Sequence, residues 1–176
     1  LRVLYGVYAL AVFVILALLA LACILLLPTL RWRRTAARNA ARASLFLTGM
    51  PVTLRGESMI PNNQCVVVAN HASYLDGIVF RFGFVIKREM DSVPLAGLLL
   101  RRIGSEFVDR SNRNKSASDA RRVLRTASNG HSLVFFPEGT FANEPGLLKF
   151  HTGAFAIAAR AGCPIVPAII RGTRHV

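Results

Sequence analysis

The chain has 176 residues, of which 53% are hydrophobic, and its 22 Lys and Arg against 9 Asp and Glu give a formal net charge of +13. The hydrophobic share excludes an intrinsically disordered chain and is sufficient for a sizeable core or a membrane segment. The length suits one domain of ordinary size with an appended segment. The charge predicts attraction to a polyanion, either a nucleic acid or an anionic membrane surface.

An uncharged apolar run from Val3 to Leu27 is the first feature along the chain. A helix of about 20 such residues crosses the roughly 30 Å hydrocarbon core of a bilayer, and this run is longer. The alternatives are a cleaved signal peptide, whose apolar stretch is usually only about 7–15 residues long, and a buried core helix. We therefore expect residues 1–28 to form a retained membrane helix that projects from the rest of the chain, with its sides free of protein contacts.

Arginines follow this run at once, and no acidic residue occurs between Pro28 and Glu57. Basic flanks of a membrane helix stay in the cytoplasm, so everything after residue 28 is expected on the cytosolic side of the inner (plasma) membrane. Residues 29–51 are rich in arginine and alanine, which predicts a basic helix lying on the membrane surface, with a solvated linker as the alternative. The expected anionic partner is therefore a membrane surface, and nucleic acid is not expected.

From residue 52 onward, short apolar runs rich in β-branched residues alternate with longer helical segments. The expected strands are 65–69, 82–87, 106–108, 132–136 and 165–170, and the expected helices are 93–102, 116–128 and 152–161. Continuous apolar strands that alternate with helices predict an α/β fold with a mostly parallel, buried sheet flanked by helices. Because ligands of such sheets bind beyond the carboxyl ends of the strands, functional residues are expected at that edge.

The three cysteines do not form a metal site by their spacing. Cys23, Cys65 and Cys163 are scattered and lie in apolar surroundings. No pair has the spacing of metal ligands, and a cytosolic domain keeps such thiols reduced. We expect small buried apolar side chains and no metal.

A histidine and an aspartate follow the first expected strand, where the sequence reads Asn70-His71-Ala72-Ser73-Tyr74-Leu75-Asp76. On one regular helix, side chains five residues apart diverge by about 140°, so the pair meets only if His71 lies in the strand-to-helix turn. Asp76 could then accept the Nδ1 proton of His71, fix its tautomer and leave Nε2 to act as a general base. The alternative for a pair at this spacing is a surface turn.

Two further strand ends carry polar residues. The block Phe136-Pro137-Glu138-Gly139-Thr140 follows an apolar run, and its alternative is a simple turn with a solvated glutamate. The run from Glu106 ends in Arg110, for which the alternative is a surface ion pair with Asp109. Since the carboxyl ends of parallel strands lie at one edge, we expect His71, Arg110 and Glu138 to converge on one cleft.

Taken together, these residues resemble the four ordered motifs of the glycerolipid acyltransferase superfamily, and bacterial 1-acylglycerol-3-phosphate acyltransferases are its most similar members. The motifs are Asn70-His71 with Asp76, the segment 104–110, the block 136–140 and Val166-Pro167-Ala168. The resemblance covers roughly residues 52–172. It implies that residues 52–176 are an acyltransferase domain, and we expect this domain to be incomplete at its C-terminus because the family domain continues beyond the fourth motif.

The resemblance also implies a role for individual residues. His71 would be the catalytic base and Asp76 its partner. The implied substrate-binding residues are Arg110 on the acceptor's phosphate, Glu138, Gly139 and Thr140 around the acceptor, and the basic side chains Lys87 and Lys149. Two departures from the family pattern are visible: Phe141 replaces a frequent arginine, for which Lys149 would compensate, and the stretch from Gly77 to Phe82 is short, either because a loop is trimmed or because residues are missing.

The implied reaction is transfer of a fatty acyl group from acyl-carrier protein or acyl-CoA to the free hydroxyl of a lysophospholipid. The first expected acceptor is 1-acylglycerol-3-phosphate, which would give phosphatidate, and the alternative is another lyso-lipid such as lyso-ornithine lipid. No cofactor is expected, since the thioester is a co-substrate. Two rival classes remain. A serine hydrolase would need a Gly-x-Ser-x-Gly turn, which the sequence lacks, and a membrane-tethered basic binding domain would account for the charge but not for the motif order.

Overall fold

A five-stranded parallel sheet forms the centre of the molecule. The structure, a computed structural model, describes residues 1–73, 76–77, 80–109, 113–140 and 146–173. Within them the strands are β1 (Val66–Ala69), β2 (Gly83–Lys87), β3 (Glu106–Val108), β4 (Leu133–Phe135) and β5 (Ile165–Ala168), in the spatial order β3-β2-β4-β1-β5. Every pair is parallel, so the expected fold class is confirmed.

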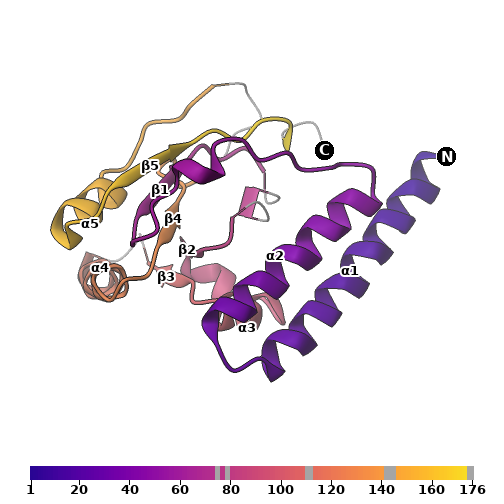
Figure 1. The fold of residues 1–176 in the computed structure, drawn as a ribbon, viewed down its shortest axis with the longest axis horizontal. Coiled ribbons are helices and arrows are strands. Elements are labelled where there is room, and N and C mark those ends of the chain that lie inside the picture. Colours follow the sequence, from indigo (N-terminus) through magenta and orange to yellow (C-terminus); the bar gives the residue numbers. More distant parts are fainter. Residues whose placement is uncertain (74–75, 78–79, 110–112, 141–145, 174–176) are drawn as a thin grey trace.

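Helices cover both faces of the sheet (Figure 1). One face packs against α4 (Arg113–Ser128) and α5 (Gly153–Ala161), whose Val123 and Ile157 join the strand side chains in one buried cluster. The other face packs against α3 (Ala96–Arg102) and the two N-terminal helices in a second cluster. Both faces are apolar, which is why β1 and β4 are buried along their whole length.

The two N-terminal helices, α1 (Arg2–Leu26) and α2 (Leu30–Leu47), lie side by side and antiparallel (Figure 1). The pairing reaches the far end of the hairpin, because the hydroxyl of Tyr5 donates to the carbonyl of Thr48 at 2.7 Å. At the other end, Ala20 and Ile24 are buried in the same cluster as β1 and β4. The expectation that α1 projects with its sides free of protein contacts is therefore wrong.

The physical reason is that α1 is apolar on every side, so its sequence does not reveal which side meets a neighbour. Small residues of α2, among them Ala36 and Ala40, let the last turns of α1 approach the sheet. Most of the first half of α1 remains exposed, including Leu4 and Leu10. By length and composition alone, α1 is the one helix of the described chain that could span a membrane.

The thiols do not share one environment. Cys65 is buried as expected, but Cys23 is exposed on α1 and Cys163 is partly buried, so the expectation of three buried residues was wrong for Cys23. Within the described residues, no group of three or more His, Cys, Asp and Glu side chains could hold a metal ion.

Candidate active site

His71 lies in the turn directly after β1, where its ring meets the carboxylate of Asp76. Nδ1 of His71 is 3.0 Å from Oδ2 of Asp76, as the spacing predicted. The carboxylate is fully buried, whereas the His71 side chain keeps 18% of its surface exposed. The structure therefore has a partly exposed imidazole at the carboxyl end of β1 with a buried carboxylate behind it. The alternative of a surface turn is wrong.

Four donors surround the Asp76 carboxylate. Its Oδ2 accepts from the backbone N–H groups of Ala72 at 2.6 Å and Ser73 at 2.9 Å as well as from His71, and Oδ1 accepts from the hydroxyl of Thr173 at 2.6 Å. Burial alone would raise the pKa of this carboxyl, but hydrogen bonds from His71, Thr173, Ala72 and Ser73 outweigh burial and lower the pKa below its usual value. Asp76 is thus ionised at neutral pH, and when it accepts the Nδ1 proton of His71 it makes Nε2 the basic nitrogen of the ring.

Acid should remove part of the protein's stability through Asp76. Because its pKa is lower in the folded chain, its ionisation stabilises the fold fully above the unfolded pKa of about 3.9 and progressively less as pH falls through the folded value. We expect the free energy of unfolding of Asp76→Asn to fall less steeply than that of wild type below about pH 4. Chemical denaturation from pH 7 to pH 3 measures both slopes, and parallel curves would contradict this assignment.

Glu138 holds the His71 turn from the neighbouring strand. It follows β4, is only 4% exposed, and its two oxygens accept the backbone N–H groups of His71 at 2.8 Å and Leu148 at 2.7 Å. The ring of His71 also stacks on Phe136, with 4.3 Å between ring centroids. The alternative of a solvated glutamate is therefore wrong. Glu138 thereby joins the backbone of the His71 turn to that of Leu148.

The remaining candidates differ in how the structure places them. Gly139 forms the tight turn after β4 with φ of 73°, in the left-handed region that favours glycine. Thr140 is exposed two residues after Glu138, Lys149 is exposed next to Leu148, and Lys87 is exposed at the carboxyl end of β2. Arg110 lies outside the described residues, so its predicted convergence with His71 remains a prediction.

The sheet order gives the separation of the strand ends that precede these two positions. β3, which leads to residue 110, is three strands from β1 in the order β3-β2-β4-β1. At roughly 4.8 Å per strand, the two carboxyl ends are about 14 Å apart along the same edge.

Comparison with known proteins agrees with this geometry. Residues 51–171 match the model of a family described as Acyltransferase. The chain belongs to this acyltransferase family. It is 32% identical over 171 residues to the lyso-ornithine lipid O-acyltransferase of Rhizobium meliloti, covering 95% of this chain and 57% of that protein. It is 31% identical over 134 residues to the 1-acyl-sn-glycerol-3-phosphate acyltransferase of Haemophilus influenzae, covering 69% of this chain and 56% of that protein.

A solved structure has the same fold as this acyltransferase. The crystal structure of the 1-acyl-sn-glycerophosphate acyltransferase PlsC from Thermotoga maritima matches with a TM-score of 0.80 and 22% identity, covering 99% of this chain and 78% of that one. The N-terminal hairpin is thus part of the shared architecture. The chain spans about half the length of the two curated relatives.

Sequence reasoning named Asn70 but missed its partner Ile170 and the role of Thr173, which together join the segment after β5 to the His71 turn. Asn70 donates to the carbonyl of Ile170 at 3.0 Å and accepts from its N–H at 2.7 Å, across 100 residues of sequence. This pairing brings Thr173 to the buried oxygen of Asp76. In the sequence, Asn70 and the end of the last predicted strand are both expected at the carboxyl edge of the sheet. This expectation does not tell which residue of that strand Asn70 contacts.

Thr173 should therefore act as a positioning residue for the acyltransferase reaction. A hydrogen bond to a charged group contributes about 1.5–3 kcal/mol, so Thr173→Val should lower kcat about tenfold or more while KM changes little. Thr173→Ser keeps the hydroxyl and should retain most of the rate. Steady-state kinetics on both variants check this, and equal losses in the two would assign Thr173 a packing role instead.

A second group that the sequence did not reveal holds the end of β3. Asp119 of α4 is 1% exposed and accepts the backbone N–H of Asp109 at 2.8 Å, one residue before Arg110. It also accepts from Arg88 at 2.7 Å and from Arg122 at 2.9 Å. Burial would raise the pKa of Asp119, but these three donors lower it. This carboxylate anchors the chain at the point from which residue 110 continues.

Proposed function

We propose that the protein transfers a fatty acyl group from acyl-CoA or acyl-carrier protein to the free hydroxyl of a lysophospholipid, with 1-acylglycerol-3-phosphate as the preferred acceptor and phosphatidate as the product. The observation that carries the proposal is the 3.0 Å contact between His71 and the buried, ionised Asp76 at the carboxyl end of β1. Family membership supports acyl transfer, and the names of the relatives support a lyso-lipid acceptor.

The proposed chemistry needs one base. Nε2 of His71 removes the proton of the acceptor hydroxyl as its oxygen attacks the thioester carbonyl carbon. The resulting tetrahedral intermediate collapses, the carbon–sulfur bond breaks, and the thiolate takes the proton from the imidazolium. Asp76 stabilises the imidazolium between these steps and holds the tautomer that makes Nε2 basic. Glu138 and Phe136 fix the backbone and the ring of His71, so little freedom is lost when the substrates meet it.

A panel of acceptors tests the proposal. The full chain in detergent is given a labelled acyl thioester and, in turn, 1-acylglycerol-3-phosphate, lysophosphatidylcholine and lyso-ornithine lipid. We expect the highest kcat/KM with the phosphomonoester acceptor. Absence of transfer to every acceptor would overturn the proposed function. Running the panel with acyl-CoA and with acyl-carrier protein identifies the donor.

Lyso-ornithine lipid is the second candidate acceptor. The relative of that name matches 95% of this chain, including the N-terminal helices. Phe141 stands where an arginine is frequent in the phosphate-binding members of the superfamily, as the sequence pattern indicated. A preference for the zwitterionic lyso-ornithine lipid over the phosphomonoester would move the assignment to this acceptor while leaving acyl transfer intact.

We further propose that the hairpin attaches the protein to the cytosolic side of the inner membrane. A lipid acceptor requires contact with a bilayer, and α1 exposes apolar side chains along its length, among them Leu10 and Val14. Because α2 accompanies α1, full insertion of α1 would carry Arg38 and Arg42 toward the hydrocarbon, at about 2.5–3.5 kcal/mol for each arginine. This cost favours a membrane-embedded hairpin over a spanning one.

Charges on the exposed face of α1 should detach the protein from membranes. We expect Leu10→Asp with Val14→Asp to abolish most flotation with liposomes, because both side chains are exposed and their replacement leaves the buried core intact. The control adds the same two charges on the exposed face of α4, as Ala117→Asp with Ala120→Asp. Equal flotation of the two variants would argue against the hairpin as the attachment. Protease digestion of sealed inverted vesicles separately tests the cytosolic placement.

A further inference from the structure

A cavity of about 620 Å³ lies at the opposite edge of the sheet from His71. Its walls include Asn63 before β1, Phe82 before β2 and Ser132 before β4. Because these strands are parallel, the cavity lies at their amino ends, and the four residues of β1, about 13 Å at roughly 3.3 Å per residue, separate it from the dyad. It is therefore distinct from the candidate active site.

Arginines from α2 form one side of this cavity. Arg31, Arg34 and Arg38 line it and follow one another at spacings of three and four residues, which places them on one face of the helix. Arg81 lines it from the segment before β2. Among the described residues, the cavity wall contains no acidic side chain, and Glu57 outside it pairs with Arg38 at 2.9 Å and Arg81 at 4.0 Å. The four arginines and Glu57 together leave an excess of three positive charges at the cavity.

Two buried donors of these arginines have no hydrogen-bond acceptor within the described part of the chain. They are Nη2 of Arg34 and Nε of Arg38. Arg34 is held in place, since its Nε donates to the carbonyl of Ile103 at 2.8 Å and its Nη2 lies so close to Gly83 that a Cβ there would come within 2.9 Å. Burial also lowers the pKa of Arg34, which indicates a desolvated charge without a compensating anion.

We propose that this cavity binds a phosphate-type oxyanion, either inorganic phosphate or the phosphate headgroup of an anionic lipid, and that the bound anion fastens α2 to the α/β domain. Planar guanidinium groups with paired N–H donors match the geometry of phosphate oxygens. The neutral side chains of Asn39, Asn63 and Ser132 line the same space and supply further donors. Since α2 carries α1, the anion couples the apolar hairpin to the domain. The site is independent of the proposed acyl transfer.

The first experiment uses inorganic phosphate on the full chain in detergent. A ligand that binds only the native state raises the unfolding midpoint, so phosphate at constant ionic strength should raise it for wild type. The test variant is Arg31→Gln with Arg81→Gln, which should lose the rise. The exposed side chain of Arg31 makes no hydrogen bond or ion pair within the described residues, and the Arg81 side chain is 49% exposed, so neither change disturbs the core.

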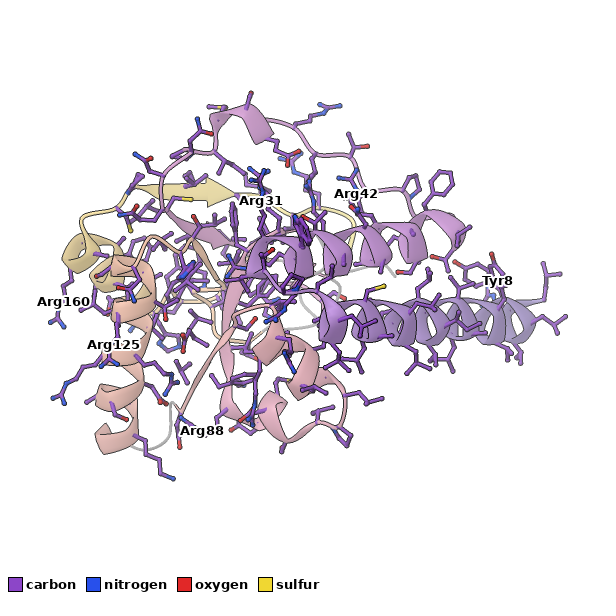
Figure 2. All side chains as sticks on the ribbon, turned by 60° about the horizontal axis from the view of Figure 1, so that its bottom comes forward. Tyr8, Arg31, Arg42, Arg88, Arg125 and Arg160 are labelled. Atoms are coloured by element: carbon purple, nitrogen blue, oxygen red, sulfur yellow. The ribbon has the colours of Figure 1, made fainter. Side chains whose placement is uncertain are left out.

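The control variant, Arg125→Gln with Arg160→Gln, removes the same charge from α4 and α5, which lie on the other face of the sheet from Arg31 of α2 (Figure 2). It should keep the phosphate-dependent rise. No rise in wild type, or equal rises in all three proteins, would overturn the proposal. If the double variant does not fold, Arg31→Gln alone is measured, and it should reduce the rise relative to Arg125→Gln.

The second experiment identifies the source of the phosphate. Flotation is compared on phosphatidylcholine vesicles with and without phosphatidate. If a lipid headgroup occupies the cavity, the part of binding that depends on phosphatidate is lost in the Arg31 and Arg81 variant, kept in the control, and competed by inorganic phosphate. If phosphatidate-dependent flotation is the same in the test and control variants, but only the control keeps the phosphate-dependent rise of the unfolding midpoint, inorganic phosphate is the ligand. If neither measurement separates the two variants, the cavity is not an anion site.

Discussion

Replacing His71 by alanine should lower kcat for acyl transfer by about 10²–10⁴-fold, the usual contribution of a general base. In the proposed mechanism, Asp76, which lies 3.0 Å from Nδ1 of His71, fixes the Nδ1 proton and so makes Nε2 the base for the acceptor hydroxyl. The KM for the thioester should change little, because in the proposed mechanism His71 acts on the hydroxyl proton of the acceptor. Single-turnover assays with a labelled thioester measure the rate, and circular dichroism checks that the fold persists.

A rescue experiment separates loss of the base from loss of packing. The imidazole ring stacks on Phe136 and leaves a ring-shaped space in the variant. Added imidazole should therefore restore part of the activity of His71→Ala, with an optimum set by the pH at which free imidazole is neutral. Activity above about one tenth of wild type without imidazole would assign the base to another residue, because a general base contributes at least about 10²-fold.

The fold was predictable because its main signal is local. The strands are short runs rich in apolar residues, of which β1 and β4 are buried along their whole length, so strands and helices could be placed to within a few residues. The contact of His71 with Asp76 was predictable for a related reason. Five residues in a turn after a strand leave few conformations in which a buried carboxylate can find donors, and the neighbouring backbone N–H groups supply them.

Other features depend on contacts between distant segments. Nothing near Thr173 in the sequence indicates that its hydroxyl contacts a carboxylate. Its place beside Asp76 depends on the pairing of Asn70 with Ile170. The uniform apolarity of α1 likewise concealed its packing against α2, which Tyr5 fastens through a backbone carbonyl. The pattern within a segment shows which of its faces are apolar. Which other segment packs against such a face is determined by the fold of the whole chain.

Glu138 has the second largest expected effect, although it touches the reaction only through the backbone. Each of its oxygens accepts one N–H group, from His71 and from Leu148. In Glu138→Gln, one oxygen becomes an amide NH₂ that faces a backbone donor, so one of these groups loses its acceptor in a buried position. Hydrogen bonds to a charged group contribute about 1.5–3 kcal/mol. This corresponds to about a 10–100-fold loss in kcat if the N–H group that loses its acceptor is that of His71.

The kinetics distinguish positioning from general destabilisation. Glu138→Gln should lower kcat with both thioester donors and leave their KM values close to wild type, because the donor does not contact this side chain in the proposed mechanism. The matched control is Asp91→Asn, which also exchanges a carboxylate for an amide and breaks an ion pair, with Arg101 at 2.6 Å, away from the His71 turn. It should lower the unfolding midpoint without lowering kcat. A loss of kcat in Asp91→Asn as large as in Glu138→Gln would show that the effect comes from stability, and would remove Glu138 from the positioning of the base.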